Sequence, residues 1–369
     1  MTRYILKDVI FRANTKVDKD TTDLAYYVGG EHFTPGDVVV EQRGLIEGST
    51  IGPMFYYGFR KGQFLLVSRN PHLKKAGVVD FDGICSEKTF VLESANPSIL
   101  SPRYLPFVLQ NDHFWEYAVA NRHGSTNFFI NWATLSSYEF ELPCIEEQER
   151  IADILWALVK VKKSYELLLK TTDELVKTQF VEMIEKSDQT NTLGCFIKRC
   201  TPQRCGNRDL PVLSVTKEKA IVLQDERFDS TVVSRDKSNY IVVPKGFIVQ
   251  GIHIDEGNFG LQNVVEEGIV SPAYKLWQIT NHGVIPELLE FYLRSQQAIE
   301  YYSRNFQGST VKRRQVIRTE DLLSMPTNIP SMPIQKAFWD LKLQSDKSKE
   351  ELTQAINRID DMVKAVLQV

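Results

Sequence analysis

The chain has 369 residues, of which 43% are hydrophobic and 25% are charged, a balance typical of folded proteins and not of disordered ones. A formal net charge of -3 excludes a surface that attracts nucleic acid everywhere, so DNA contact would require local basic patches. No apolar run approaches the ~18 residues of a membrane-spanning helix, and the odd number of cysteines, 5, suits a reducing compartment. We therefore expect two domains, a cytoplasmic location and no membrane contact.

Strands and short helices are predicted on both sides of the chain's midpoint. Apolar runs broken by Gly, Pro and Asn indicate strands at DVVVEQRG (37–44), QFLLVSRN (63–70), AIVLQDERF (220–228) and SNYIVVPKGFIVQGIHI (238–254). Short helices are predicted within residues 102–121 and 285–305. The mixture predicts an α+β module in each half of the chain.

Two long amphipathic helices are predicted, one after Pro143 and one at the end of the chain. Apolar side chains recur there every three or four residues without an interrupting Gly or Pro. At ~1.5 Å per residue, roughly 36 residues extend about 54 Å, so each helix needs a partner along its length. We expect antiparallel, coiled-coil-like pairing of the two helices, with two unrelated surface helices as the alternative. The predicted seam consists of Leu155, Leu158, Leu168, Ile356 and Ile359.

The two halves of the sequence resemble each other. DGICSEKTFVLES (82–94) matches EGIVSPAYKLWQI (267–279) at an offset of 185. Gly124, Ser125 and Thr126 match Gly308, Ser309 and Thr310 at an offset of 184. Pro143 and Gln148 match Pro330 and Gln335 at an offset of 187, so the same order of segments is kept three times. The repeat predicts two copies of one module, related by a pseudo-twofold axis.

A duplicated module with LPCIEEQERIADIL (142–155) at its junction resembles the specificity (S) subunits of type I restriction-modification systems. Glu147, Gln148, Ile151 and Leu155 fit the family's junction, whereas Ile334 replaces the corresponding glutamate in the second copy. The resemblance covers essentially the whole chain. It implies target recognition domains at residues 1–142 and 188–329 and spacer helices at residues 143–187 and 330–369.

The resemblance also implies a function without catalysis. In the family, each target recognition domain reads one half of a split double-stranded DNA site, and the helices space the domains and bind two methyltransferase (M) subunits. A restriction and translocation (R) subunit joins this complex. The alternatives are a related bipartite system with a fused methyltransferase and nuclease, a nuclease using Asp37, Glu41 and Arg43, and a coiled-coil scaffold.

Basic and amide side chains in polar loops are the candidates for DNA contact, because Arg and Lys bind phosphates or guanine and Asn and Gln bind adenine. A solvated turn or an ordinary polar hairpin is the alternative for each loop. In the first half the candidates are Arg69, Asn70, Lys74, Lys75, Arg122, His123, Ser125 and Thr126. In the second half they are Gln250, His253, Arg304, Ser309, Thr310, Lys312, Arg313 and Arg314.

Motifs for cofactor or metal chemistry are not recognisable. There is no Gly-rich phosphate loop and no His-Glu-x-x-His pair, so no cofactor and no metal are expected. Cys195, Cys200 and Cys205 could supply three zinc ligands, but neither a paired CxxC nor a placed fourth ligand accompanies them, which favours free thiols.

Overall fold

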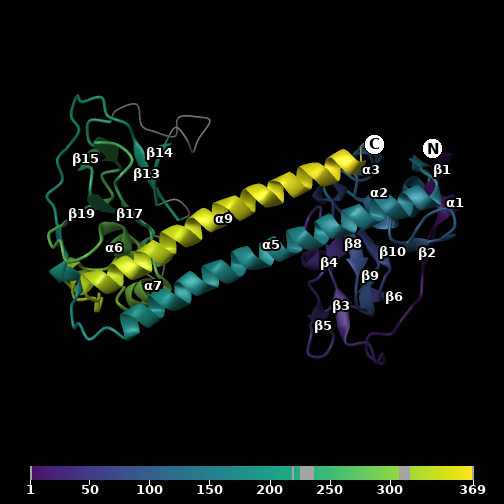
Figure 1. Ribbon diagram of the computed structural model, residues 1–369, viewed down its shortest axis with the longest axis horizontal. Coiled ribbons are helices and arrows are strands. Elements are labelled where there is room, and N and C mark those ends of the chain that lie inside the picture. The colour runs from purple at the N-terminus through teal and green to yellow at the C-terminus, as the bar shows by residue number, and fades with distance from the viewer. Residues whose placement is uncertain (1, 218–219, 225–236, 307–315, 368–369) are drawn as a thin grey trace. The chain divides into compact units, whose positions relative to one another are not determined.

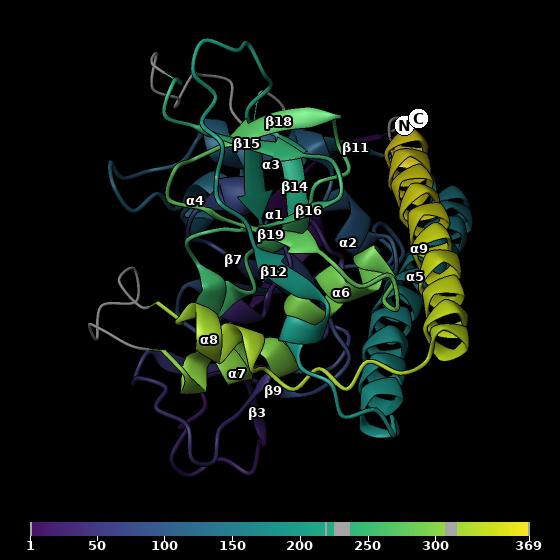
Figure 2. The same ribbon diagram turned by 90° about the vertical axis from the view of Figure 1, so that its left-hand side faces the viewer.

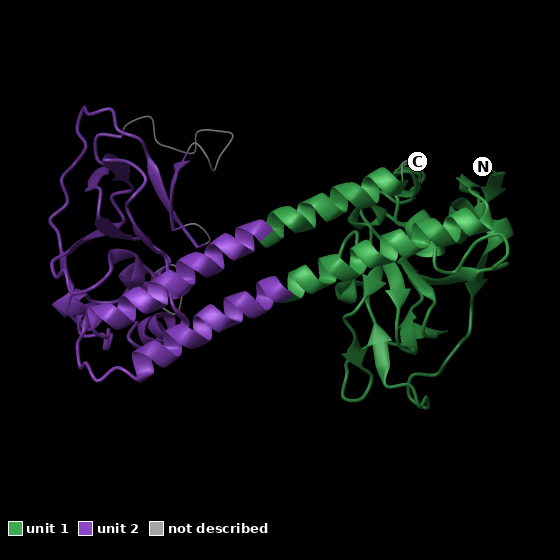
Figure 3. Cartoon of the chain, viewed as in Figure 1, with its two compact units in different colours: residues 1–167, 352–369 green, residues 168–351 purple. Residues whose placement is uncertain are grey.

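The computed structural model describes residues 2–217, 220–224, 237–306 and 316–367 (Figure 1). Its internal contacts divide the chain into two compact units (Figure 3): unit 1 contains residues 1–167 and 352–369, and unit 2 contains residues 168–351. Each unit combines an α+β module with a part of each long helix, α5 (Ile145–Glu185) and α9 (Met332–Leu367). Within the described ranges, no helix has both the length and the apolar composition to cross a bilayer.

Unit 1 contains two sheets of four or more strands and one two-stranded sheet. The larger has the strand order β2-β10-β7-β8-β4 and the smaller β5-β3-β9-β6, while β1 pairs with β11. Its strands are β1 (Thr2–Ile5), β2 (Ile10–Ala13), β3 (Tyr26–Val28), β4 (Val39–Val40), β5 (Gly44–Leu45), β6 (Phe55–Phe59), β7 (Phe64–Val67), β8 (Ala76–Val79), β9 (Gly83–Ser86), β10 (Thr89–Ser94) and β11 (Glu139–Leu142). Its short helices are α1 (Leu6–Val9), α2 (Leu105–Val108), α3 (Asp112–Ala120) and α4 (Trp132–Leu135), with 3-10 turns η1 (Gly30–His32) and η2 (Pro71–Leu73).

The larger sheet of unit 1 is buried on both faces. Phe64 and Leu66 of β7 pack with the helices α2, α3 and α4. Leu65 and Val67 of the same strand pack into a second cluster on the opposite face. This alternation follows from the period of two residues in a strand, and it explains why FLLV is apolar at every position.

Unit 2 repeats this plan. Its described strands are β12 (Ile197–Arg199), β13 (Leu213–Thr216), β14 (Ala220–Leu223), β15 (Ile241–Pro244), β16 (Phe247–Gln250), β17 (Phe259–Leu261), β18 (Glu267–Val270) and β19 (Lys275–Ile279). Its short helices are α6 (Pro286–Leu293), α7 (Gln296–Arg304) and α8 (Thr319–Leu323), with 3-10 turns η3 (Leu193–Cys195) and η5 (Ile254–Glu256). Figure 2 shows α6, α7 and α8 together on one side of β12 and β19, where Ile248 and Trp277 are buried with them.

Strand pairing confirms the repeat seen in the sequence. The order β12-β19-β16-β17 in unit 2 reproduces β2-β10-β7-β8 in unit 1. A parallel pairing of Tyr27 with Ile84 in unit 1 recurs in unit 2 as a bridge between Val212 and Ile269. Both members of that pair are displaced by the same offset of 185 (212 - 27 and 269 - 84), so the duplication extends to the register of individual residues.

The two long helices run antiparallel, and each unit contains one ion pair between them. In unit 1, Lys162 Nζ of α5 lies 2.6 Å from Asp360 Oδ1 of α9. In unit 2, Lys349 Nζ of α9 lies 2.7 Å from Asp173 Oδ1 of α5. The two lysines are related by an offset of 187 and so are the two aspartates, so the repeat places the same contact in both units. The predicted antiparallel pairing is thereby confirmed.

A buried glutamine fixes the start of each long helix to its own module. Gln148 Nε2 donates to the carbonyl oxygens of Ile99 (2.8 Å) and Pro143 (2.9 Å), and its Oε1 accepts from the Ser101 N–H (2.9 Å). Gln335 makes the same three bonds, to the carbonyl oxygens of Gly283 (2.7 Å) and Pro330 (2.8 Å) and from the Ile285 N–H (2.9 Å). Both side chains are 0% exposed. Each helix therefore begins two residues after its proline, in the second copy as in the first.

Candidate nucleic-acid interface

Two loops that were predicted separately lie side by side in unit 1. The Asn70 N–H donates to the Phe128 carbonyl (2.8 Å), and the Ile130 N–H donates to the Ser68 carbonyl (2.9 Å). A β-bridge between Arg69 and Phe129 joins the same two segments. The structure thus brings residues 67–77 and 121–131 into one surface, which we call the unit 1 polar surface.

Aromatic rings hold the cations of the unit 1 polar surface. The Arg122 guanidinium lies 4.2 Å from the centre of the Phe128 ring, and the Arg69 guanidinium lies 5.3 Å from that of Phe129. His123 packs against Phe129, with 5.7 Å between the ring centres. These contacts limit the freedom of the side chains. Arg69 Nη1 also donates to the Asn127 carbonyl at 3.3 Å, and His123 Nε2 lies 3.1 Å from Thr134 Oγ1 and 3.0 Å from Asn131 Nδ2.

A tight turn forms the tip of the unit 1 polar surface. Gly124 has φ +90, and a Cβ at this position would lie 2.7 Å from the Asn127 carbonyl oxygen, so only glycine fits. Ser125 and Thr126 follow it and are exposed. The turn therefore presents two hydroxyl groups to solvent.

Lys74 and Lys75 are engaged within unit 1. Lys74 Nζ lies 2.7 Å from Asp112 Oδ1, and this hydrogen bond lowers the pKa of the Asp112 carboxyl. Lys75 Nζ donates to the Gly30 carbonyl at 2.7 Å. Both lysines therefore fasten their loop to neighbouring segments, and the Lys74 charge is already partly compensated.

The candidates in unit 2 are more dispersed. Gln250 is 4% exposed, and its Oε1 accepts from the Trp277 indole N–H at 3.1 Å, so its amide belongs to the interior and not to a base-reading surface. His253 is half-buried at the start of η5, and Arg304 is exposed at the end of α7 with Glu300 3.5 Å away. Ser309, Thr310, Lys312, Arg313 and Arg314 lie outside the described residues.

Three further cations, not singled out from the sequence, lie on the sheets of the two units. Arg199 of β12 donates from Nη1 to Thr319 Oγ1 at 3.2 Å, and Lys275 of β19 donates to the Ile317 carbonyl at 3.4 Å. Arg12 of β2 stacks on Phe90, 4.6 Å from the ring centre. Two of these three cations could have been identified by extending the sequence repeat upstream, because Arg12 and Arg199 match at the offset of 187.

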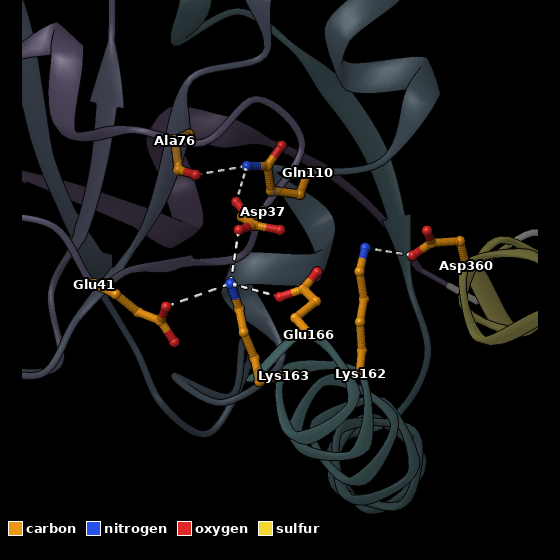
Figure 4. Close-up of polar contacts among 8 residues, drawn as sticks. All are labelled: Asp37, Glu41, Ala76, Gln110, Lys162, Lys163, Glu166 and Asp360. Atoms are coloured by element: carbon orange, nitrogen blue, oxygen red, sulfur yellow. Dashed lines mark hydrogen bonds and ion pairs between the residues drawn. The ribbon is translucent and has the colours of Figure 1, made fainter. Parts of the chain in front are cut away.

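The carboxylates of the alternative nuclease hypothesis, Asp37 and Glu41, are bound by a lysine (Figure 4). Lys163 Nζ of α5 lies 2.8 Å from Asp37 Oδ2, 3.5 Å from Glu41 Oε2 and 3.4 Å from Glu166 Oε2. Burial lowers the Lys163 pKa, but the hydrogen bond and charge of Asp37, with the two glutamates, outweigh it and raise the pKa. An ammonium ion held at this place fits a structural cluster and not a metal site. Arg43 stacks on Tyr26, 4.2 Å from the ring centre.

The cysteines show no arrangement for zinc in the part of the chain that the structure describes. Cys195 is exposed, Cys200 is half-buried, and Cys205 is buried with its Sγ donating to the Arg208 carbonyl at 3.0 Å. No group of three or more His, Cys, Asp or Glu side chains in the described ranges could hold a metal ion.

The helix residues that were predicted to form the seam differ in burial. Leu155 is 0% and Ile359 7% exposed, and Leu158 and Ile356 are half-buried. Leu168, in contrast, is 49% exposed. It lies thirteen residues after Leu155, which at about 100° per residue places it about 140° away around the helix. Its assignment to the seam is therefore corrected.

The junction residues of α5 have separate roles. Glu147 is held by Arg150 through two hydrogen bonds of 2.8 and 2.6 Å, which lower the pKa of its carboxyl. Ile151 is half-buried one turn before Leu155, and Gln148 joins the helix to the module.

Comparison with known proteins finds one matching family model and several solved structures with a similar fold. Residues 9–169 match the family described as the type I restriction modification DNA specificity domain. A chain from a study of complex assembly and conformational transition of the type I R-M system aligns with a TM-score of 0.59 and 15% identity, covering 100% of this chain and 96% of that one. The S subunit of a type I restriction-modification system from M. genitalium aligns with a TM-score of 0.56 and 11% identity over 99% of this chain and 94% of its own. No curated protein sequence is similar enough to count as a relative.

Proposed function

We propose that the chain is the non-catalytic specificity subunit of a type I restriction-modification system, reading a DNA target split into two half-sites; residues 9–169 match the family of type I restriction-modification DNA specificity domains. The expected resemblance to this family is confirmed. Two steps beyond it, the bipartite target and the binding of partner subunits, are our proposal. We also propose a cytoplasmic location, because a subunit with this task works where the DNA is.

The observation that carries the proposal is a repeated scaffold with unlike surfaces. The strand order and the glutamine junction are the same in both units. The residues on the surfaces differ: unit 1 presents Arg122 and His123 on aromatic rings, and the positions that match them at the offset of 184 are Phe306 and Gln307. Two DNA-recognition domains that share one fold but differ in surface chemistry suit two half-sites of different sequence. We therefore infer an asymmetric split target.

The helix pair provides a means of fixing the distance between half-sites. The 41 residues of α5 extend about 60 Å at ~1.5 Å per residue. That length exceeds one turn of DNA, which is about 34 Å. We infer that α5 and α9 set the number of base pairs between the half-sites, and that selectivity requires both half-sites at that spacing.

An exposed apolar stripe on α5 supports partner binding. Ile154, Val161, Leu168 and Leu175 follow one another at intervals of seven residues and are 40%, 41%, 49% and 49% exposed. Seven residues are nearly two helical turns, so these side chains share one face. We infer that helices of two methyltransferase (M) subunits pack on α5 and α9, and that a restriction and translocation (R) subunit joins them for cleavage.

The test is to co-express the chain with its candidate methyltransferase (M) subunit and to map the modified adenines in the host DNA. We expect one split motif, with two different half-sites separated by a constant number of unspecified base pairs. A continuous motif would overturn the bipartite reading. A double variant, with Ile154 and Val161 both changed to Glu, tests the methyltransferase contact in the same co-expression. We expect this variant to lose the modification because the methyltransferase no longer binds.

A further inference from the structure

Arg199 and Lys275 lie on the same face of two paired strands in unit 2. Arg199 of β12 is the register partner of Trp277 in β19, and Lys275 precedes Trp277 by two residues. Because alternate residues of a strand share a face, both cations flank the buried Trp277 ring. The segment before and at the start of α8 holds them, through Thr319 Oγ1 (3.2 Å from Arg199 Nη1) and the Ile317 carbonyl (3.4 Å from Lys275 Nζ).

These two cations have no carboxylate partner within the described ranges. Neighbouring basic residues of unit 2 do have one, as for Lys245 Nζ, which lies 2.7 Å from Glu266 Oε1, and Arg208, which pairs with Glu267. Lys275 is partly buried, and burial and then the Arg199 charge lower its pKa. Two like charges held together without a counter-charge are unfavourable, and an anion bound between them would relieve the repulsion.

We propose that Arg199 and Lys275 form a binding site for one phosphodiester group of the DNA backbone. This inference rests on the proposed DNA-reading function and assigns a role within it. The guanidinium supplies two N–H groups in a fixed plane and the ammonium supplies a point charge, and both suit phosphate oxygens.

The position of the site indicates a contact that does not depend on DNA sequence. Arg12 occupies the corresponding position in unit 1 at the offset of 187, so the arginine is common to both modules. A residue common to both modules cannot by itself distinguish two different half-sites. Phosphate contacts position a protein on DNA, whereas base contacts give specificity. The site therefore anchors unit 2 on its half-site without reading it.

The experiment uses the full chain co-purified with its methyltransferase and two DNA duplexes, one with the mapped target and one scrambled. Binding is measured over a range of salt concentrations for wild type, Arg199→Gln, Lys275→Gln and the double variant. We expect the double variant to bind both duplexes about tenfold more weakly, by the same factor. The slope of log affinity against log salt should become shallower by about 0.9, the contribution of one phosphate.

Three control variants separate the site from a general effect of charge and from misfolding. Lys245→Gln removes one charge at the turn before β16 and should leave the slope as in wild type. Arg199→Lys and Lys275→Arg keep the charge and should retain most of the affinity. Because the Lys275 pKa is lowered, the charged form is disfavoured in the folded state, so Lys275→Gln should unfold at the same or a higher temperature than wild type.

The outcomes distinguish this inference from the proposed function. An unchanged slope in the double variant would overturn the phosphate site, and so would a loss confined to the mapped target, which would indicate base reading. If wild type binds both duplexes equally, the specificity function fails instead. The slope on the scrambled duplex then still tests the phosphate site, because that contact does not need the target sequence.

Discussion

Corresponding edges of the two units carry the same arginine in different surroundings. In unit 1, Arg12 stacks on the ring of Phe90. In unit 2, Arg199 faces Lys275, which occupies the position of Phe90 at the offset of 185. A buried apolar cluster packs against the main sheet of each unit, as a folded core requires. The comparison teaches that the core keeps the scaffold constant while the surface at the same place changes from a stacked cation to a pair of cations.

The largest expected effect tests whether the two units share their junction. Gln148→Ala and Gln335→Ala each remove three hydrogen bonds and leave buried carbonyl oxygens and an N–H without partners. We expect each change to lower the free energy of unfolding by about 3 kcal/mol, because each unsatisfied buried group costs ~1–3 kcal/mol. Chemical denaturation followed by circular dichroism measures the loss.

A half-buried glutamine on α5, the helix of Gln148, is the matched control. Gln179 makes one side-chain bond, from Nε2 to Glu182 Oε2 at 3.1 Å. Gln179→Ala should change the free energy of unfolding by less than about 0.5 kcal/mol, as for most surface substitutions. If only one of the two junction variants is destabilised, the equivalence of the junctions is refuted.

A second, smaller effect on stability should be specific to unit 1, because unit 2 has no lysine at the position that matches Lys163. Position 350, which corresponds to 163 at the offset of 187, is a glutamate. Lys163→Met leaves the carboxylates of Asp37, Glu41 and Glu166 without their shared cation. We expect a loss of about 1–2 kcal/mol at neutral pH, less than the ~3–5 kcal/mol of a fully buried pair that loses one partner.

The pH dependence of stability checks that assignment. The Lys163 pKa is raised in the folded protein. Its contribution is therefore fully present below the unfolded pKa of about 10.4 and is lost as the pH rises through the higher folded pKa. Above pH 10, the stability of wild type should fall toward that of Lys163→Met. A constant difference between the two proteins from pH 7 to 12 would contradict the ion pair as its cause.

The smallest effect concerns the two ion pairs between the helices. Double-mutant cycles on Lys162 with Asp360 and on Lys349 with Asp173, each changed to Ala, measure the coupling energy of each pair. We expect about 0.2–1 kcal/mol for both, because the side chains are partly exposed. The two coupling energies should agree and should both decrease at 1 M salt. Coupling at only one pair would show that equal geometry does not give equal energy.

The features that could be predicted from the sequence are those that depend on hydrophobic periodicity and on the internal repeat. The long helices, the short helices of both modules and the matching glutamines follow from local patterns and from one alignment of the chain with itself. Leu168 was assigned wrongly because spacings of three and four do not by themselves select one face over thirteen residues. Gln250 could not be distinguished from a surface amide, because its burial depends on Trp277 in another strand.

The sequence indicated two candidate loops in unit 1, but it did not predict that they adjoin. Residues 69–75 and 122–126 stand out as polar and nearly acid-free, and the structure joins them. The pair of Arg199 and Lys275 was not predictable in this way, because the two residues are far apart in the sequence and meet only through the pairing of β12 with β19. Sheet register between distant strands is set by the packed fold and not by local composition.

The ion pairs between the helices have a consequence for the ancestry of the chain. Lys162 and Asp173 lie eleven residues apart on α5, and Lys349 and Asp360 lie eleven residues apart on α9. Each helix thus carries both the cation and the anion of the contact, so two antiparallel copies of one helix would satisfy each other. Such a surface is isologous, as in a symmetric homodimer. A half-length ancestor with one module and one helix could therefore have paired with itself before gene duplication and fusion joined the two copies.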